Sequence, residues 1–375
     1  MLGDRPAVPT PPVDHGSGPA DAADPAAPWP PTPDQTLFRP RQLTSQDRVE
    51  LLLAIGSAVG ASWVLCLVMD WQEPLTFAIW ALIWFLGATY LLARDRTSKV
   101  VALDKLVTTL IWTTGAIAVG VLAWMIVFVV IKGIGGLSWT FFTEDMAEVG
   151  PLDTGGGAYH AIVGTVEQIL IATVLAVPIA ILTAVYLHEI KGRLAVPVRF
   201  VVDAMSGLPS IVAGLIVFTI WVNEGHGFSG ASAGVALAIM MIPIVTRTSE
   251  EILRTIDDGL RESALALGAP QWRSVLQVVL PTARAGLITA SILGIARSVG
   301  ETAPVLLTAF GSSVTNYNPF DGPQADLPLF IWSLLREPNQ AQVDRAWSGA
   351  LVLIILVLAL FVTARVVGER GARRR

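Results

Sequence analysis

The chain has 375 residues, of which 53% are hydrophobic and 15% are charged, and its formal net charge is −5 at pH 7. Soluble domains carry about a quarter charged residues, whereas here the apolar residues fall in runs of about 20, the length that crosses the hydrocarbon core of a bilayer. The composition excludes a soluble globular enzyme and predicts an all-α polytopic membrane protein. Cys66 is the single cysteine, so no disulfide can form within the chain.

The N-terminal segment, residues 1–48, is rich in Pro, Ala and Asp. Such a segment buries too little apolar surface to offset the entropy that ordering would cost, so we predict a disordered cytoplasmic tail. Its first residues lack an apolar core after a basic start, and no cleavable signal peptide is expected.

Eight apolar runs follow this tail and predict about eight transmembrane helices. The fifth run is the shortest, and it can be extended backwards through Phe200, interrupted by Asp203 and Pro209. The predicted spans are residues 50–69, 75–93, 107–132, 161–187, 208–222, 231–246, 282–309 and 347–367.

The charges between the spans predict the orientation of the chain. Lys and Arg gather before the first span and after the second, fourth, sixth and eighth spans, whereas the loops on the other side are mostly acidic. By the positive-inside rule, the basic loops and both termini are cytoplasmic. The alternation supports an even number of spans and predicts a multi-pass protein of the bacterial cell membrane.

A polar, helical stretch at Arg261–Pro281 separates the sixth span from the seventh. Its residues favour a helix as far as Leu267, Gly268 stands where a helix end accepts a left-handed residue, and Pro270 prevents simple continuation. We predict a short helix, a sharp turn and a second helix. A short helix projecting from a membrane domain suits a groove on a soluble partner; the alternative is an ordinary amphipathic hairpin.

The same stretch resembles the EAA loop of ABC-importer permeases, whose pattern is Glu-Ala-Ala, three residues, Gly, nine residues and Ile-x-Leu-Pro. The matching residues here are Glu262, Ala264, Gly268, Val278, Leu280 and Pro281, with Ser263 in place of the first Ala and Val278 in place of Ile. The resemblance implies that this loop, within 248–281, is a coupling helix that docks into a cleft of an ATPase subunit.

Two ionisable residues interrupt the seventh span. An ionisable residue at a span centre costs roughly 2.5–3.5 kcal/mol on insertion scales, so Arg297 and Glu301 need a reason to be there. Four residues apart, they are expected to share a helix face and pair, with Pro304 bending the helix beyond them. Either the pair only holds helices together, or Arg297 attracts an oxyanion through its planar fork and Glu301 sets its pose.

Arg247 ends the sixth span within the sequence IPIVTRTSEE. From the residue alone, the simplest account is that its side chain extends to the cytoplasmic headgroups.

Several further segments extend the resemblance, namely GGGAYHAIVGT near 155–165, LPSIVAGL at 208–215, IPIVTRTSEEIL at 242–253 and ARSVGETAPVLLTA at 296–309. Together with the EAA-like loop they resemble the PstA family, the permeases of bacterial phosphate-specific ABC transporters. The resemblance implies a six-helix type I importer core at 107–369, with Arg247, Arg297 and Glu301 as path residues. The hairpin and basic loop at 49–106 are additional to that core, and 370–375 is a basic tail.

The resemblance also implies partners. They are a second permease (PstC-like), an ATPase dimer (PstB-like) that uses ATP and Mg²⁺, an extracytoplasmic phosphate-binding protein (PstS-like), phosphate and the lipid bilayer. The four lysines, at 99, 105, 132 and 191, all lack a P-loop context, so no cofactor is expected in this subunit and no catalytic or metal-binding residue is assigned.

Three other functions are considered. A permease for another oxyanion, such as sulfate or molybdate, would share the coupling loop. An ion-coupled secondary transporter would usually show inverted repeats with broken helices, and no convincing repeat is seen. A purely structural membrane protein would not explain the charges in the seventh span.

Overall fold

The computed structural model describes residues 45–71, 73–96, 98–150 and 152–373. Almost all of the predicted tail at 1–48, and the last residues of the basic tail, lie outside these ranges. Regular structure in the described residues is helical apart from an isolated bridge between Phe310 and Gln324. The predicted all-α class is therefore confirmed.

Seven long helices dominate the described chain. They are α1 (Ser45–Met69), α2 (Pro74–Arg96), α3 (Lys99–Gly133), α5 (Tyr159–Val185), α8 (Gly230–Arg254), α11 (Leu280–Ser298) and α14 (Gln340–Arg373). The shorter elements are η1 (Ile134–Gly136), α4 (Trp139–Thr143), η2 (Tyr186–Ile190), α6 (Ala195–Ser206), α7 (Ser210–Val217), η3 (Phe218–His226), α9 (Asp258–Ala266), α10 (Gln271–Ser274), η4 (Val275–Val279), α12 (Ala303–Thr308) and α13 (Leu327–Leu334).

The described residues contain seven helices that are long and apolar enough to cross a membrane, or eight if one bent pair counts as a span. That pair is α6 with α7 and η3, bent by 107°. It corresponds to the predicted fifth span at 208–222, and the bend falls at residues 207–209, where Pro209 cannot donate a helical hydrogen bond. The prediction of about eight spans is confirmed, with the fifth one broken.

The seventh predicted span, 282–309, is not one helix. Helix α11 ends at Ser298, residues 299–302 are non-helical, and α12 starts at Ala303. The prediction that Pro304 bends a continuous helix is therefore wrong. Pro304 instead lies in the first turn of α12, where the missing N–H costs nothing, and the chain breaks before it.

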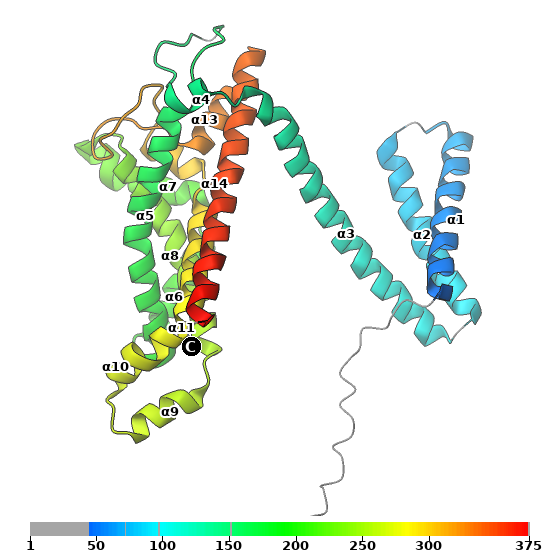
Figure 1. The fold of residues 1–375 in the computed structure, drawn as a ribbon, viewed down its shortest axis with the longest axis horizontal. Helices are drawn as coiled ribbons and strands as arrows, with labels where there is room; N and C mark the ends of the chain where they lie inside the picture. The colour runs from blue at the N-terminus through cyan, green and yellow to red at the C-terminus, as the bar shows by residue number, and fades with distance from the viewer. Residues whose placement is uncertain (1–44, 72, 97, 151, 374–375) are drawn as a thin grey trace, which may run out of the picture. The chain divides into compact units, whose positions relative to one another are not determined.

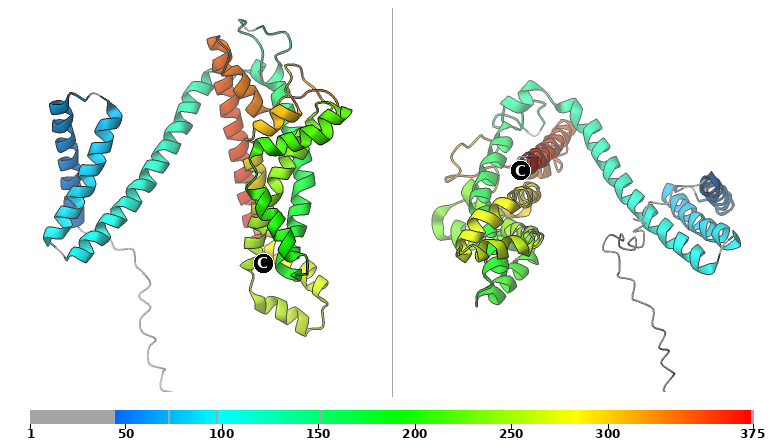
Figure 2. Two further views of the ribbon diagram at one scale, coloured as in Figure 1. Left: turned by 180° about the vertical axis from the view of Figure 1, so that it is seen from behind. Right: turned by 60° about the horizontal axis from the view of Figure 1, so that its bottom comes forward.

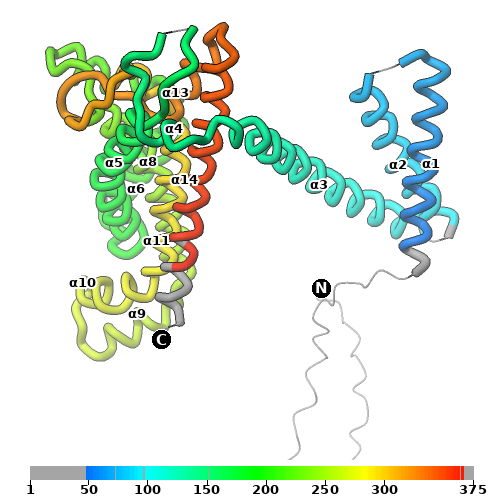
Figure 3. The backbone as a smooth tube through the Cα atoms, turned by 45° about the horizontal axis from the view of Figure 1, so that its top comes forward, coloured from blue at the N-terminus to red at the C-terminus, as the bar shows by residue number. Residues whose placement is uncertain are grey.

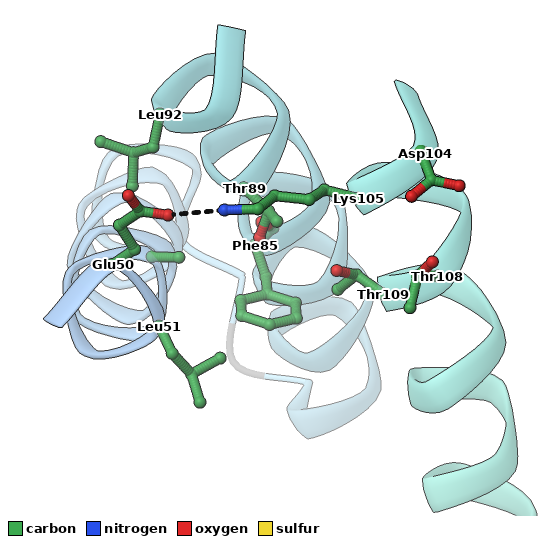
Figure 4. A pocket seen from close by; sticks show the side chains of 10 residues that line it. Glu50, Leu51, Phe85, Thr89, Leu92, Asp104, Lys105, Thr108 and Thr109 are labelled. Carbon is green, nitrogen blue, oxygen red and sulfur yellow. Dashed lines mark hydrogen bonds and ion pairs between the residues drawn. The ribbon is translucent and has the colours of Figure 1, made fainter. Parts of the chain in front are cut away.

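The described residues form two compact units that meet between Ile117 and Ala118, within α3. In the first unit, α1 packs on α2 through small buried residues that include Ala54 and Ala58. This unit contains a pocket of about 320 Å³, and Lys105 Nζ lies 3.1 Å from Glu50 Oε2 at its edge. Figure 4 shows the side chains that line this pocket. The predicted domain boundary at residue 107 stays a prediction.

The second unit is a helical bundle with a distinct structure at each end. In it α5, α8, α11 and α14 run side by side, with α9 and α10 at one end and α4 and α13 at the other (Figure 1). The views from behind and from above show the same order (Figures 2 and 3). We call the end with α9 and α10 the coupling end, and the end with α4 and α13 the cap end.

The most extensive helix contact joins α5 to α8. Along α5, alanines at 172, 176, 180 and 184 are fully buried at four-residue spacing. Small side chains let two helices approach closely, which is how helices associate in a membrane when lipid removes the hydrophobic drive. The α8 residues Leu237, Met241 and Val245 fill the facing core.

At the cap end, Gln324 is inserted between α5 and α8. Its Nε2 donates to Glu167 Oε2 at 2.6 Å, and its Oε1 accepts from Gln168 Nε2 at 3.2 Å. A Cβ on Gly230 would lie 1.9 Å from Gln324 Oε1, so any larger residue there would displace the Gln324 side chain from these bonds. These polar contacts hold α5 and α8 together near the cap end.

Candidate functional site

The loop at the coupling end has the predicted local structure. Helix α9 is capped by the Asp257 carboxylate, which accepts from Gly259 N at 2.9 Å, and it ends at Ala266. Gly268 is left-handed with φ of +82°, and its N–H donates to Leu265 O at 2.9 Å. The predicted short helix and glycine turn are confirmed, although α9 begins three residues before Arg261.

The second helix of the loop is continuous with the next span. Helix α10 passes through the wide turn η4 directly into α11. Pro281 lies in the first turn of α11, where the wider turn accommodates its missing donor. Helices α10 and α11 are therefore joined by unbroken helical backbone.

The loop is also tied to the end of α5 by Arg261. The guanidinium donates to Glu189 three times, with the shortest contact, Nη2 to Oε1, at 2.6 Å. It also donates to Asp258 and, at 3.3 Å, to Leu253 O. Gln271 adds a hydrogen bond from Nε2 to Glu189 O at 2.9 Å.

Both members of this ion pair are shielded from solvent, since the Glu189 side chain is 5% exposed and that of Arg261 is 18% exposed. Burial alone would lower the Arg261 pKa, but its hydrogen bonds and charge interaction with Glu189 outweigh burial, and the pKa is raised. Sequence reasoning treated Arg261 only as a loop charge. The signal that it missed was Glu189, an acid in the otherwise basic loop after the fourth span.

The side of the loop that faces away from the bundle is exposed in the described structure. Glu262 and Gly268 are exposed, and Ala264 is half-buried. Leu267, at the turn, is 90% exposed, and Trp272 is 59% exposed with Arg273 stacked on its ring. Two of the predicted coupling residues, Glu262 and Ala264, thus lie in α9 and the third, Gly268, lies on the turn that follows it, next to exposed apolar side chains.

Arg247 pairs with Asp203, with Nη2 and Oδ1 at 2.6 Å. One helical turn away on α6, Arg199 Nη2 lies 2.6 Å from Glu250 Oε1, which also accepts from Arg254 at 3.0 Å. These two clusters join α6 to α8. Asp203, which interrupted the predicted fifth span, is therefore the partner of Arg247.

Arg297 and Glu301 do not share a helix face. Arg297 lies in the last turn of α11, whereas Glu301 lies in the non-helical break, bonded through its N–H to Ser298 O at 3.2 Å. Among the described residues, no hydrogen bond or ion pair joins their side chains or links either one to another group. The predicted i, i+4 pair is wrong because the helix ends between its two members.

The break lies level with the middle of α8. Helices α8 and α11 are antiparallel and touch closely: a Cβ on Gly294 would lie 2.4 Å from Val245 Cγ2, and one on Gly286 at the same distance from Ile252 Cγ2. This register places Arg297 level with Ile242 and about 8 Å from Arg247 along the axis, at 1.5 Å per residue. Both arginines are exposed on the isolated chain.

Arg297, an exposed charge level with the middle of α8, lies beside the non-helical residues 299–302. Inside a bilayer, unpaired backbone groups and ionisable side chains are tolerated where they face a water-filled cavity or another protein surface. If Arg297 lies within the bilayer, its exposed side chain requires a polar path or a neighbouring subunit beside it.

Comparison with known proteins identifies related permeases. Residues 176–370 match the family of the binding-protein-dependent transport system inner membrane component. The phosphate transport system permease protein PstA 1 of Mycobacterium tuberculosis (strain CDC 1551 / Oshkosh) is 39% identical over 275 residues, which cover 72% of this chain and 90% of that protein. PstA of Yersinia pestis is 37% identical over 276 residues, covering 73% and 90% respectively.

Among solved structures, a chain of the MetNI methionine ABC transporter in an inward-facing conformation is similar, with 20% identity and a TM-score of 0.44. The match covers 58% of this chain and 94% of that chain.

Proposed function

The chain belongs to the PstA family of phosphate transport system permease proteins, and we propose that it forms half of the translocation path of an ATP-driven importer of inorganic phosphate. The observation that carries this function is the similarity to PstA permeases over about 90% of their length. The chain is a multi-pass protein of the inner membrane.

We propose that the complete importer contains three further kinds of subunit: a PstC-like second permease, a PstB-like ATPase dimer and a PstS-like extracytoplasmic binding protein. ATP and Mg²⁺ would bind to the ATPase, so this subunit transmits the energy of hydrolysis without catalysing it. The positive-inside rule supports a cytoplasmic location for both termini and the coupling end, on the side where the ATPase would lie.

Coupling is proposed to pass through two connections. The ATPase would hold α9 and the turn after it through Glu262, Ala264 and Gly268. Force on that turn would reach α11 through continuous backbone and α5 through the bond between Arg261 and Glu189. Because both connections are rigid, a shift of α9 would tilt two helices of the path together.

Substrate passage is proposed to use Arg297 first, at mid-depth, and Arg247 nearer the cytoplasm. A guanidinium can give two hydrogen bonds to one phosphate, which suits an oxyanion better than a point charge. Glu301, in the break near Arg297, would limit how tightly the anion is held. Asp203 would do the same for Arg247, to which it is already bonded.

The glycine turn offers a test of coupling. Gly268→Val forces a β-branched residue into the left-handed region, at roughly 1–2 kcal/mol, although nothing lies within 4 Å of the added Cβ. We expect phosphate uptake to be lost while membrane levels persist. Gly268→Asn tolerates that conformation and is expected to keep most of the uptake, and equal loss in both variants would show that the turn's conformation is not what matters.

The proposed function is tested by gentle purification from the native membrane and by uptake of radiolabelled phosphate. We expect a P-loop ATPase and a second permease to co-purify, and uptake to resist excess sulfate or molybdate. Purification without an ATPase would exclude the importer, and inhibition by sulfate or molybdate at concentrations similar to phosphate would reassign the substrate.

A further inference from the structure

A second polar pocket lies at the cap end of the bundle, apart from Arg247, Arg297 and Glu301. Its volume is about 620 Å³, and it is bounded by the end of α3, by η1 and α4, by residues 154–156 and by the start of α14. The groups that define its chemistry are Lys132, Ser138, Thr140 and Arg345, with Glu144 and Asp344.

Arg345 is the unusual member of this pocket. It is 7% exposed, and its Nη1 donates to Gln342 Oε1 at 2.9 Å. Gln342 is itself held by a bond from its Nε2 to Gly150 O at 3.2 Å, which fixes the arginine's pose. Among the described residues, the other guanidinium nitrogens have no hydrogen-bond acceptor and no carboxylate forms an ion pair with Arg345.

The N–H groups of Arg345 that have no partner keep some contact with solvent, so they are open to the pocket, where an anion binds a guanidinium more strongly than water does. The two acids of the pocket do not fill that role. Asp344 Oδ1 accepts from Gln340 Nε2 at 2.8 Å, and Glu144 is exposed. The position facing the free N–H groups of Arg345 therefore suits an anion supplied from outside the chain.

The wall of the pocket is held in place independently of any ligand. Ser348 Oγ donates to Gly133 O at 2.8 Å, and a Cβ on Gly133 would lie 2.6 Å from Trp347 O, so α3 ends directly against α14. The Ser138 and Thr140 hydroxyls are 2.6 Å apart. Two hydroxyl groups and two cations thus line one preformed pocket, a combination that recognises a phosphate oxygen.

We propose that this pocket binds a phosphate group, with Arg345 as the bidentate ligand and Lys132 as a second cation. Glu144 and Asp344 partly offset the charges of Lys132 and Arg345. The pocket therefore favours a singly charged anion that can exchange. That group is either the phosphodiester of a phospholipid or free dihydrogen phosphate. Trp139, 82% exposed beside the pocket, is typical of the membrane–water interface, where both sources are present. The site does not depend on the proposed transport function.

The test compares Arg345→Gln, Lys132→Gln and Arg336→Gln with the unaltered chain, each purified with its co-purifying subunits but without the extracytoplasmic binding protein. Arg336 is the matched control, since it is exposed near the same end and stacks on Trp332 at 4.5 Å outside this pocket. One arm counts phosphatidylglycerol molecules retained in native mass spectrometry. The other measures binding of radiolabelled inorganic phosphate.

We expect Arg345→Gln to weaken one binding event by about tenfold or more, as loss of a charged hydrogen-bond donor does, and Lys132→Gln to weaken it less. Arg336→Gln should change nothing. Loss of one lipid identifies a headgroup site, and loss of phosphate binding identifies a free-phosphate site. Unchanged binding in both arms would overturn the proposal, as would an equal loss in Arg336→Gln. If Arg345→Gln does not assemble, Lys132→Gln and Thr140→Val decide by the same criterion.

Discussion

Arg261→Met is expected to abolish phosphate uptake and to uncouple ATP hydrolysis from transport. The substitution leaves Glu189, whose side chain is 5% exposed, as a buried carboxylate without its charge partner. Removing one member of a buried ion pair destabilises a protein by about 3–5 kcal/mol. Here the cost falls on the junction between α9 and the end of α5, so the coupling turn should lose its fixed position before the bundle unfolds.

The measurements are uptake of radiolabelled phosphate in cells lacking other phosphate importers, and ATP hydrolysis by the purified complex. Arg193→Met is the matched control, because Arg193 is exposed on the same side and its side chain makes no hydrogen bond or ion pair with the described residues. Exchange of the pair, Arg261→Glu with Glu189→Arg, should restore part of the activity. Uptake by Arg261→Met equal to that of Arg193→Met would show that the anchor does not transmit force.

The shape of the coupling loop could be predicted from sequence, whereas its attachment could not. The helix, the left-handed Gly268 and the turn at Pro270 depend on backbone preferences of neighbouring residues. The partner of Arg261 lies 72 residues earlier in the chain. No local pattern indicates that Glu189 and Arg261 meet, because their contact depends on how α5 and the loop pack together.

The prediction for the seventh span was wrong because it assumed one continuous helix. A spacing of four residues predicts a shared face only if the helix continues through both residues. Gly300 and Pro304 weaken that assumption, and the chain breaks at 299–302. The apolar content of 282–309 is that of a span, but composition alone does not distinguish one helix from a helix, a break and a short second helix.

Ion pairs between helices could not be predicted from the sequence either. Asp203 read as an interruption of an apolar run, yet it is the partner of Arg247 on the neighbouring helix. The same holds for Arg345, which lies where the eighth helix begins and whose lack of a carboxylate partner is visible only in three dimensions. Intramembrane charges could be identified from sequence, but their partners depended on the packing.

The break in the seventh span separates the roles of Arg297 and Glu301, so single substitutions are informative. We expect Arg297→Gln to lower phosphate uptake by about 10- to 100-fold, the effect of losing hydrogen bonds to a charged group worth about 1.5–3 kcal/mol. The fold should persist, because the exposed Arg297 side chain makes no hydrogen bond or ion pair with the described residues. Arg297→Lys keeps the charge without the bidentate fork and should retain an intermediate activity.

The control for this last experiment is Arg284→Gln, an exposed arginine on the same helix about 20 Å closer to the coupling end at 1.5 Å per residue. Membrane levels and co-purification of the ATPase are measured beside the initial rate of uptake at several phosphate concentrations. A path residue should raise the phosphate concentration needed for half-maximal uptake, whereas a residue that only holds subunits together should lower assembly. Normal uptake by Arg297→Gln would remove Arg297 from the path, because a guanidinium that binds the passing anion at mid-depth cannot be replaced by an uncharged amide without cost.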